Sequence, residues 1–127
     1  ALAPTAAPAL VEFQPWCLAF SPDSASLLVG CGDGRLLQFR TADGMLRREL
    51  HGARDALFGV DFHPQGGKAA TCGRDAPRVR IWNIEAATVA RGIAAHPGWC
   101  WCVRYQPQGT LLSTCGKDQA IRLWDAE

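Results

Sequence analysis

"VRYQPQGTLLSTCGKDQAIRLWD", residues 103–125, has two earlier variants in this chain. They are "VDFHPQGGKAATCGRDAPRVRIWN" at 60–83 and "LAFSPDSASLLVGCGDGRLLQFR" at 18–40. The aromatic residue near the start of each copy, Phe20, Phe62 or Tyr105, recurs after 42 and then 43 residues. The aspartate in the later turn of each copy keeps the same two intervals. Such a period indicates a protein assembled from repeated units of ~40–45 residues.

Each copy contains short strands separated by turns. "SPDS", "HPQGG" and "QPQG" place proline early in a tight turn, where its fixed φ is favourable. "RVRIWN" and "AIRLWD" carry β-branched and aromatic residues, as strands do. "TADGML" puts Asp43-Gly44 between two such runs, which is a strong hairpin signal. No window shows a helical period, so the sequence predicts an all-β fold.

The composition is that of a folded domain with a near-neutral charge. The 127 residues are 48% hydrophobic and 20% charged, which suits a packed core. Thirteen basic and twelve acidic residues leave a formal net charge of +1, which argues against nucleic acid as a partner. No apolar run approaches the ~20 residues that span a bilayer, so we expect no membrane association. The Ala/Pro-rich segment 1–12 is interpreted as a linker or an outer-strand lead-in.

Three of the six cysteines, Cys31, Cys72 and Cys115, lie in similar phrases at the ends of predicted strands. Free thiols at such places pack as small apolar side chains. No secretion signal points to an oxidising compartment. We therefore expect reduced structural cysteines and an intracellular protein, in the cytoplasm or the nucleus.

On these phrases the chain resembles the WD40 repeat proteins, over about residues 13–127. The resemblance is fullest in the third copy, "HPGWCWCVRYQPQGTLLSTCGKDQAIRLWD". The second copy has Asn83 in place of the final Asp and one extra residue in "DAPRV"; the first has Phe39-Arg40 where Trp-Asp would stand. The resemblance implies a β-propeller segment of about three four-stranded blades, the first of them degenerate. It does not identify a subfamily.

The repeat divides the chain into blades at 13–50, 51–93 and 94–127. In the family a Trp closes the third strand of a blade and a fourth strand follows on the outer edge, so the last blade is expected to lack that strand. Propellers have about four to eight blades, and three cannot close a ring. We therefore expect further blades from the same, longer chain or from another chain.

The resemblance also implies a buried hydrogen-bonded tetrad in each well-formed blade. The tetrad runs from a turn Asp through a His and a Ser or Thr to the Trp indole, whose N–H needs an acceptor when buried. In the first blade Val29 takes the Thr position, so no tetrad is expected there. The predicted tetrads are Asp75, His51, Thr71 and Trp82 in the second blade, and Asp118, His96, Thr114 and Trp124 in the third.

His, Asp and Thr together could also form a catalytic set, but two copies that each end on a Trp favour the structural role. His96 with Cys100 and Cys102 could suggest zinc, yet Cys-x-Cys is not the usual ligand spacing and no second pair follows. We expect no catalytic residue, no metal and no cofactor. The third histidine, His63, occupies a turn and is expected to face solvent.

Propellers of this family are contacted most often on the top rim. The positions concerned begin each innermost strand or directly precede the turn Asp, and here they carry three large aromatics and two cations. Trp99 lies two residues before one of these aromatics and adds to them. The alternative is that the aromatics pack between blades. The predicted partner-binding residues are Trp16, Phe58, Trp99, Trp101, Arg74 and Lys117.

These features favour a non-catalytic interaction platform, a scaffold subunit of a multiprotein complex that binds protein or peptide partners. One alternative is a reader of methyl-lysine or another cationic peptide, because aromatic cages attract quaternary ammonium groups. An enzyme and an RNA-binding module that stacks bases on the tryptophans are weaker alternatives.

Overall fold

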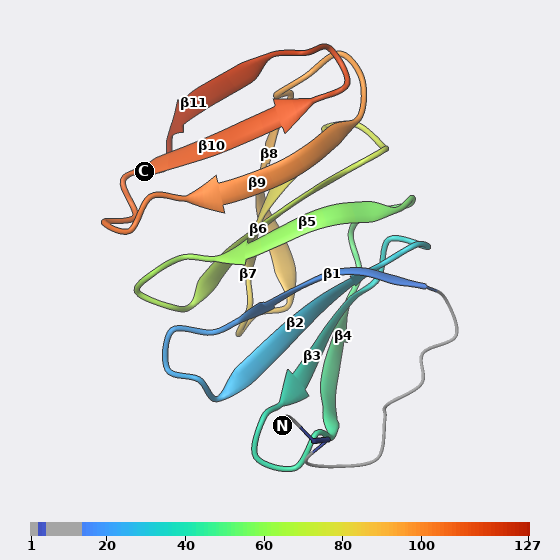
Figure 1. Cartoon of the computed structure of the whole chain (residues 1–127), viewed down its shortest axis with the longest axis vertical. Helices are drawn as coiled ribbons and strands as arrows, with labels where there is room; N and C mark the ends of the chain where they lie inside the picture. The colour runs from blue at the N-terminus through green and yellow to red at the C-terminus, as the bar shows by residue number, and fades with distance from the viewer. Residues whose placement is uncertain (1–2, 5–13) are drawn as a thin grey trace.

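The computed structural model describes residues 3–4 and 14–127. In these residues, eleven strands form three antiparallel sheets, which lie face to face one above another (Figure 1). The first sheet contains β1 (Pro15–Phe20), β2 (Ser26–Cys31), β3 (Leu36–Arg40) and β4 (Leu46–Leu50). The second contains β5 (Leu57–Phe62), β6 (Lys68–Gly73), β7 (Val79–Asn83) and β8 (Thr88–Ile93). The third contains β9 (Cys100–Tyr105), β10 (Leu111–Gly116) and β11 (Ile121–Asp125).

The predicted fold class is confirmed: the described residues form two four-stranded sheets and one three-stranded sheet, in the arrangement of a partial propeller. Strands follow one another within each sheet in chain order, as hairpins require. We call the sheets blades one, two and three. No helix among the described residues is long and apolar enough to cross a bilayer. The predicted segment 1–12 lies outside the described residues, apart from Ala3 and Pro4.

Turn chemistry explains where the strands end. Gly44 of the "TADGML" turn has φ 71°, and its N–H donates to the Arg40 carbonyl at 2.8 Å. Gly109, in "QPQG", has φ 83° and donates to the Gln106 carbonyl. Glycine adopts this left-handed backbone without steric cost, which fixes the hairpins that the sequence predicts.

The position of His63 differs from the expectation that it faces solvent. Its Nε2 lies 3.1 Å from the Gly109 carbonyl oxygen in blade three, and its ring packs edge-on against Tyr105 at 5.0 Å. Its Nδ1 accepts the Gln65 backbone N–H at 3.1 Å. The turns of blades two and three lie side by side, so His63, in the turn after β5, contacts blade three.

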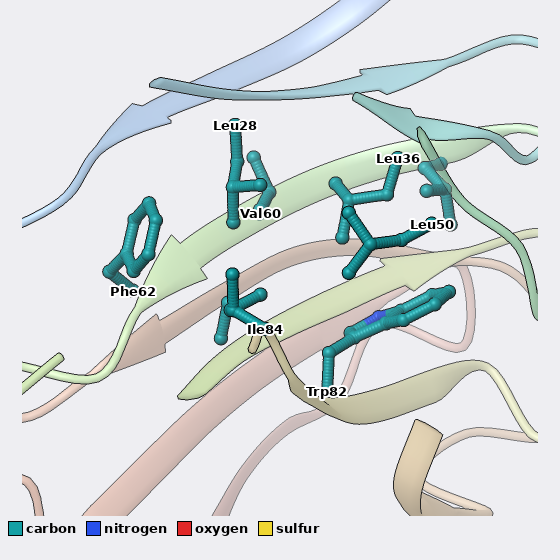
Figure 2. Close-up of a cluster of buried hydrophobic side chains, with 9 residues drawn as sticks. Leu28, Leu36, Leu50, Val60, Phe62, Trp82 and Ile84 are labelled. Atoms are coloured by element: carbon teal, nitrogen blue, oxygen red, sulfur yellow. The ribbon is translucent and has the colours of Figure 1, made fainter. Parts of the chain in front are cut away.

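The main core lies between blades one and two. Strands of both sheets send alternate side chains into it, as the period of two along a strand requires. Figure 2 shows Leu28, Leu36 and Leu50 of blade one facing Val60 and Trp82 of blade two. Trp82 is fully buried, so blade one covers the residue that the repeat places at the end of β7. A second apolar cluster, around Cys100, Val103 and Leu112, joins blades two and three in the same way.

Candidate functional site

Each innermost strand contains a β-bulge, and an aromatic residue occupies the bulge position in all three. In β1 the pairing with β2 steps from Pro15 directly to Cys17, so Trp16 is the extra residue. The register skips Phe58 in β5 and Trp101 in β9 in the same way. Bulges re-aim a side chain and bend the strand, which explains how all three aromatics come to lie at one end of their blades.

The three bulge residues and Trp99 form one continuous aromatic cluster across the three blades. Phe58 is at its centre, with ring centroids 6.3 Å from Trp16, 6.0 Å from Trp99 and 5.1 Å from Trp101. Trp99 meets Trp101 edge to face at 5.7 Å. Tilted and edge-on geometries at these separations are favourable for aromatic pairs. The structure thus brings together all four aromatics predicted for the rim.

Both predicted cations lie over the Trp99 ring. The Arg74 guanidinium is 4.4 Å from the ring centroid, and Lys117 Nζ is 4.9 Å from it. Arg74 also pairs with Asp55, Nε to Oδ2 at 3.6 Å. Within residues 14–127, Lys117 forms no ion pair, so its charge remains available at the surface. We call the set Trp16, Phe58, Arg74, Trp99, Trp101 and Lys117 the aromatic rim.

The rim combines exposed apolar area with internal packing. Trp16 is 56% exposed and Trp101 is 43% exposed, whereas Phe58 and Trp99 are half-buried between them. Large exposed aromatics on a fixed backbone are the side chains that most often anchor a protein partner. Phe58 therefore packs between blades, which is the alternative role considered for these aromatics. Trp16 and Trp101 keep much of their ring area exposed to solvent.

In blade three the predicted tetrad residues form a continuous hydrogen-bonded chain. The Trp124 indole N–H donates to Thr114 Oγ1 at 2.9 Å, and Thr114 Oγ1 lies 2.8 Å from His96 Nε2. His96 Nδ1 lies 2.8 Å from Asp118 Oδ1. When Nδ1 carries the proton it donates to the carboxylate, and Nε2 accepts from the Thr hydroxyl. Arg122 Nη1, which can only donate, lies 2.7 Å from the same Nδ1. The Arg122 guanidinium, at 2.7 Å from Asp118 Oδ2, holds the pKa of that carboxyl down at about 2.

The prediction for His51 in blade two is wrong. Trp82 donates to Thr71 Oγ1 at 2.8 Å, as expected, but the chain stops there. His51 is exposed, and its Nε2 lies 3.3 Å from Glu49 instead. Asp75 pairs with Arg80 at 2.9 Å and accepts the Arg54 backbone N–H at 3.0 Å.

The length of the preceding loop accounts for the difference. His51 stands six positions before β5 begins at Leu57, whereas His96 stands four positions before β9 begins at Cys100. The two extra residues carry His51 past the Thr71 hydroxyl. The backbone N–H of Arg54 then reaches the carboxylate that the imidazole would have met.

Two arginines of this network were missed by the sequence interpretation. Arg80 is buried and lies directly opposite Thr71 in the β6–β7 pairing, and Arg122 lies opposite Thr114 in the β10–β11 pairing. Both bind the turn aspartate of their blade. An Arg two residues before each Trp was a signal that could have found them, because it repeats in "RIW" and "RLW". Within residues 3–4 and 14–127, no group of three or more His, Cys, Asp or Glu side chains could hold a metal ion.

Two four-stranded sheets and one three-stranded sheet, repeated along the chain and packed face to face, are the blades of a β-propeller class of repeat protein. The family "WD domain, G-beta repeat" matches residues 12–39 and 88–125. The chain belongs to the WD40 repeat family.

The relatives it matches are larger WD-repeat proteins. It is 31% identical over 117 residues to "Intraflagellar transport protein 122 homolog" of Danio rerio, across 92% of this chain and 9% of that protein. It is 31% identical over 112 residues to "Nuclear distribution protein nudF 1" of Talaromyces marneffei, across 86% and 24%. It is 23% identical over 109 residues to "WD repeat and SOCS box-containing protein 1" of Danio rerio, across 85% and 26%. The chain thus spans about a quarter or less of each of these relatives.

Proposed function

We propose that this chain is part of a non-catalytic, intracellular protein-interaction scaffold that binds a protein or peptide partner on its aromatic rim. The WD40 family and the WD-repeat relatives support a scaffold role. Six free cysteines fit an intracellular, reducing environment. Further blades, from a longer chain or another chain, would complete the propeller around the same axis.

One observation carries this proposal: the bulges present aromatic residues from three separate blades as one surface. Trp16 and Trp101 offer exposed ring area on a rigid sheet, and an aromatic side chain has only two torsions to immobilise on binding. The unpaired charge of Lys117 beside them favours a partner segment that carries acidic residues near an apolar anchor.

The alternative of a methyl-lysine reader is less well supported by the rim. An aromatic cage needs a free ring face for the ligand's ammonium group. Arg74 and Lys117 already lie over Trp99, and their charges repel a further cation. No feature of the aromatic rim specifically favours RNA binding or enzymatic activity.

Trp101→Ala tests the proposal. The variant and the wild type are compared, each within a longer chain that supplies the neighbouring repeats, by quantitative mass spectrometry of proteins retained from native cell extract. We expect at least one partner to be lost, with a cost in affinity of about 2 kcal/mol or more, which is typical of a buried aromatic anchor. Lys117→Glu is expected to slow association with an acidic segment and to weaken its salt dependence.

Two surface residues away from the rim provide matched controls. Met45→Ala removes an exposed apolar side chain from the β3–β4 turn, and Lys68→Glu reverses an exposed charge at the start of β6. Both should retain every partner. If Trp101→Ala keeps the full set of partners while remaining folded, the rim is a packing feature and the proposed binding surface is wrong.

A further inference from the structure

A pocket of about 240 Å³ lies between blades one and two. Blade one lines it with Ser21 and Gln38, and blade two lines it with Phe62 and Gly66. Trp16 lies near the start of β1 and Ser21 directly follows its end, so the pocket and the aromatic rim lie at opposite ends of the strands. Both walls belong to blades that the structure describes, so further blades elsewhere in a propeller leave the pocket unchanged.

At the equivalent interface, between blades two and three, the ring of His63 fills this space. His63 directly follows β5, as Ser21 directly follows β1. Its Nε2 lies 3.1 Å from the Gly109 carbonyl oxygen, and its ring packs edge-on against Tyr105. A Cβ placed on Gly109 would lie 2.6 Å from His63 Cε1, so the imidazole takes all the room in front of this glycine.

Between blades one and two, a serine leaves the same space open. Ser21 Oγ donates to Asp23 Oδ1 at 2.5 Å and accepts the Ser26 backbone N–H at 2.9 Å, so its side chain folds back on its own turn. Gly66 takes the position of Gly109, yet a Cβ placed on it would meet no described atom within 4 Å. The Gly66 carbonyl accepts no hydrogen bond from the described residues. The pocket volume is many times the ~10–15 Å³ that one water molecule requires, so a small ring fits there.

Gln38 adds a buried hydrogen-bond acceptor to the pocket wall. It lies two residues after Leu36 in β3, so its side chain leaves the strand on the same face, toward blade two. Gln38 is 4% exposed, and its Nε2 donates to Ser26 Oγ at 3.0 Å, but its Oε1 has no partner among the described residues. The equivalent residue of β7 is Ile81, which packs against an apolar cluster. A buried amide oxygen without a donor is costly, so a ligand N–H that reaches it is favoured.

The charged groups at the pocket favour a basic ligand over an acidic one. Asp23 and Glu85 line the pocket with a single guanidinium, that of Arg47. The Ser21 hydroxyl lowers the pKa of the Asp23 carboxyl, so that group is ionised at neutral pH. Two carboxylates and one cation repel an anion and attract an N–H donor.

We propose that this pocket binds the imidazole ring of a histidine side chain from a protein partner. The ring takes the place that His63 occupies in the next interface, against Phe62 in place of Tyr105. Its N–H donates to the Gly66 carbonyl, and a protonated ring offers a second N–H to Gln38 Oε1. The protein source of the histidine rests on the proposed scaffold function, whereas the pocket is a second recognition site, separate from the aromatic rim.

Imidazole itself is the probe that tests the pocket. Saturation-transfer NMR is recorded with the wild type, within a longer chain that supplies the neighbouring repeats, at a pH well above the imidazole pKa. We expect imidazole to bind and 1-methylimidazole, which then has no N–H, to bind about tenfold more weakly or not at all. The peptide Gly-His-Gly should displace imidazole, and Gly-Phe-Gly should not. Displacement by neither peptide would overturn the assignment to a partner's histidine.

Variants assign the signal to this pocket. Ser21→His should abolish imidazole binding by filling the pocket from within, and Gln38→Ile should weaken it by removing the acceptor. Both should raise the urea midpoint, because each removes either empty space or an unpaired buried oxygen.

Two further variants are controls. Met45→His adds a histidine at an exposed turn and should bind imidazole as the wild type does. Trp101→Ala should also keep imidazole binding, which separates this site from the rim. A wild type that does not bind imidazole, equal binding of 1-methylimidazole, or a folded Ser21→His variant with wild-type binding would overturn the proposal.

Discussion

The Thr114 hydroxyl in blade three has two side-chain partners, Trp124 and His96. Thr114 Oγ1 accepts from the Trp124 indole and contacts His96 Nε2, whereas among the described side chains Thr71 Oγ1 in blade two bonds only to Trp82. Both threonines are buried. The two blades therefore provide an internal comparison between a hydroxyl with two partners and a hydroxyl with one.

Thr114→Val should destabilise the protein by about 1–3 kcal/mol, because it leaves the partly buried Trp124 indole N–H and the buried His96 Nε2 unpaired. Thr71→Val should cost less, because only the Trp82 N–H loses its partner. Urea unfolding followed by tryptophan fluorescence measures both, and Thr110→Val, at an exposed threonine, is the control. Equal losses for the two buried variants would show that the contact with His96 adds no stability.

The Asp118 carboxylate should make the stability of blade three depend on pH in acid. Its pKa is lowered from 3.8 to about 2, chiefly by Arg122 and further by His96. A lowered folded-state pKa means that the unfolded chain binds more protons in this interval, so the stabilisation is present above pH 3.8 and is lost as pH falls to about 2. Asp118→Asn should therefore show a flatter pH dependence of its urea midpoint there. Asp125→Asn, at an exposed carboxylate, should retain the wild-type slope.

At the scale of strands, the bulge is the element that determines the site. The bulge leaves Trp16, Phe58 and Trp101 without a partner residue in the neighbouring strand. The residues that follow each bulge pair in regular register, so alternate side chains point to the same face of the sheet. One backbone feature, repeated in each blade, thus positions the aromatic rim.

The third strands of blades two and three differ in their neighbours. β7 is paired on both sides, with β6 and β8, whereas within residues 3–4 and 14–127 β11 is paired only with β10. Amide hydrogens of Ile121–Asp125 should therefore exchange faster than those of Val79–Asn83, by about tenfold or more, because an edge strand opens locally at lower cost. Hydrogen exchange with mass spectrometry measures this difference. Equal protection of β7 and β11 would indicate that another segment pairs with β11.

At the scale of the whole molecule, blades one and three each have one face that a neighbouring blade covers in blade two. Leu18 is 63% exposed, whereas Val60 at the equivalent position of β5 is 7% exposed. Ile121 is 81% exposed, whereas its counterpart Val79 is fully buried. No blade formed by the described residues lies beside these two positions, which is why they are exposed, and both faces are suited to association.

The chain of 127 residues by itself should therefore self-associate. Phe20 and Leu123 belong to the two uncovered faces and are both exposed. Phe20→Glu combined with Leu123→Glu should reduce the sedimenting mass toward that of a monomer, because each charge opposes burial of the apolar face. Glu127→Ala, outside both faces, should behave as the wild type. A wild-type chain that sediments as a monomer and unfolds in one sharp calorimetric transition would contradict this expectation.

The sequence by itself determined the repeat, and with it the all-β fold. Proline and glycine turns and short β-type runs are local signals that the backbone follows without help from distant segments, and their recurrence after 42 and 43 residues marks the copies. The WD40 resemblance then pointed to the rim positions. Counting back from Phe20, Phe62 and Tyr105 also found the three aromatic residues that the structure brings together.

Only the tertiary structure decided which side chains meet across blades. His51 and His96 occupy similar phrases, yet two additional loop residues place one at the surface and the other against Thr114. His63 contacts the next blade, and the two cations stack on Trp99, through packing between sheets that no single repeat encodes. Contacts of this kind depend on loop length and sheet spacing, which are properties of the assembled fold.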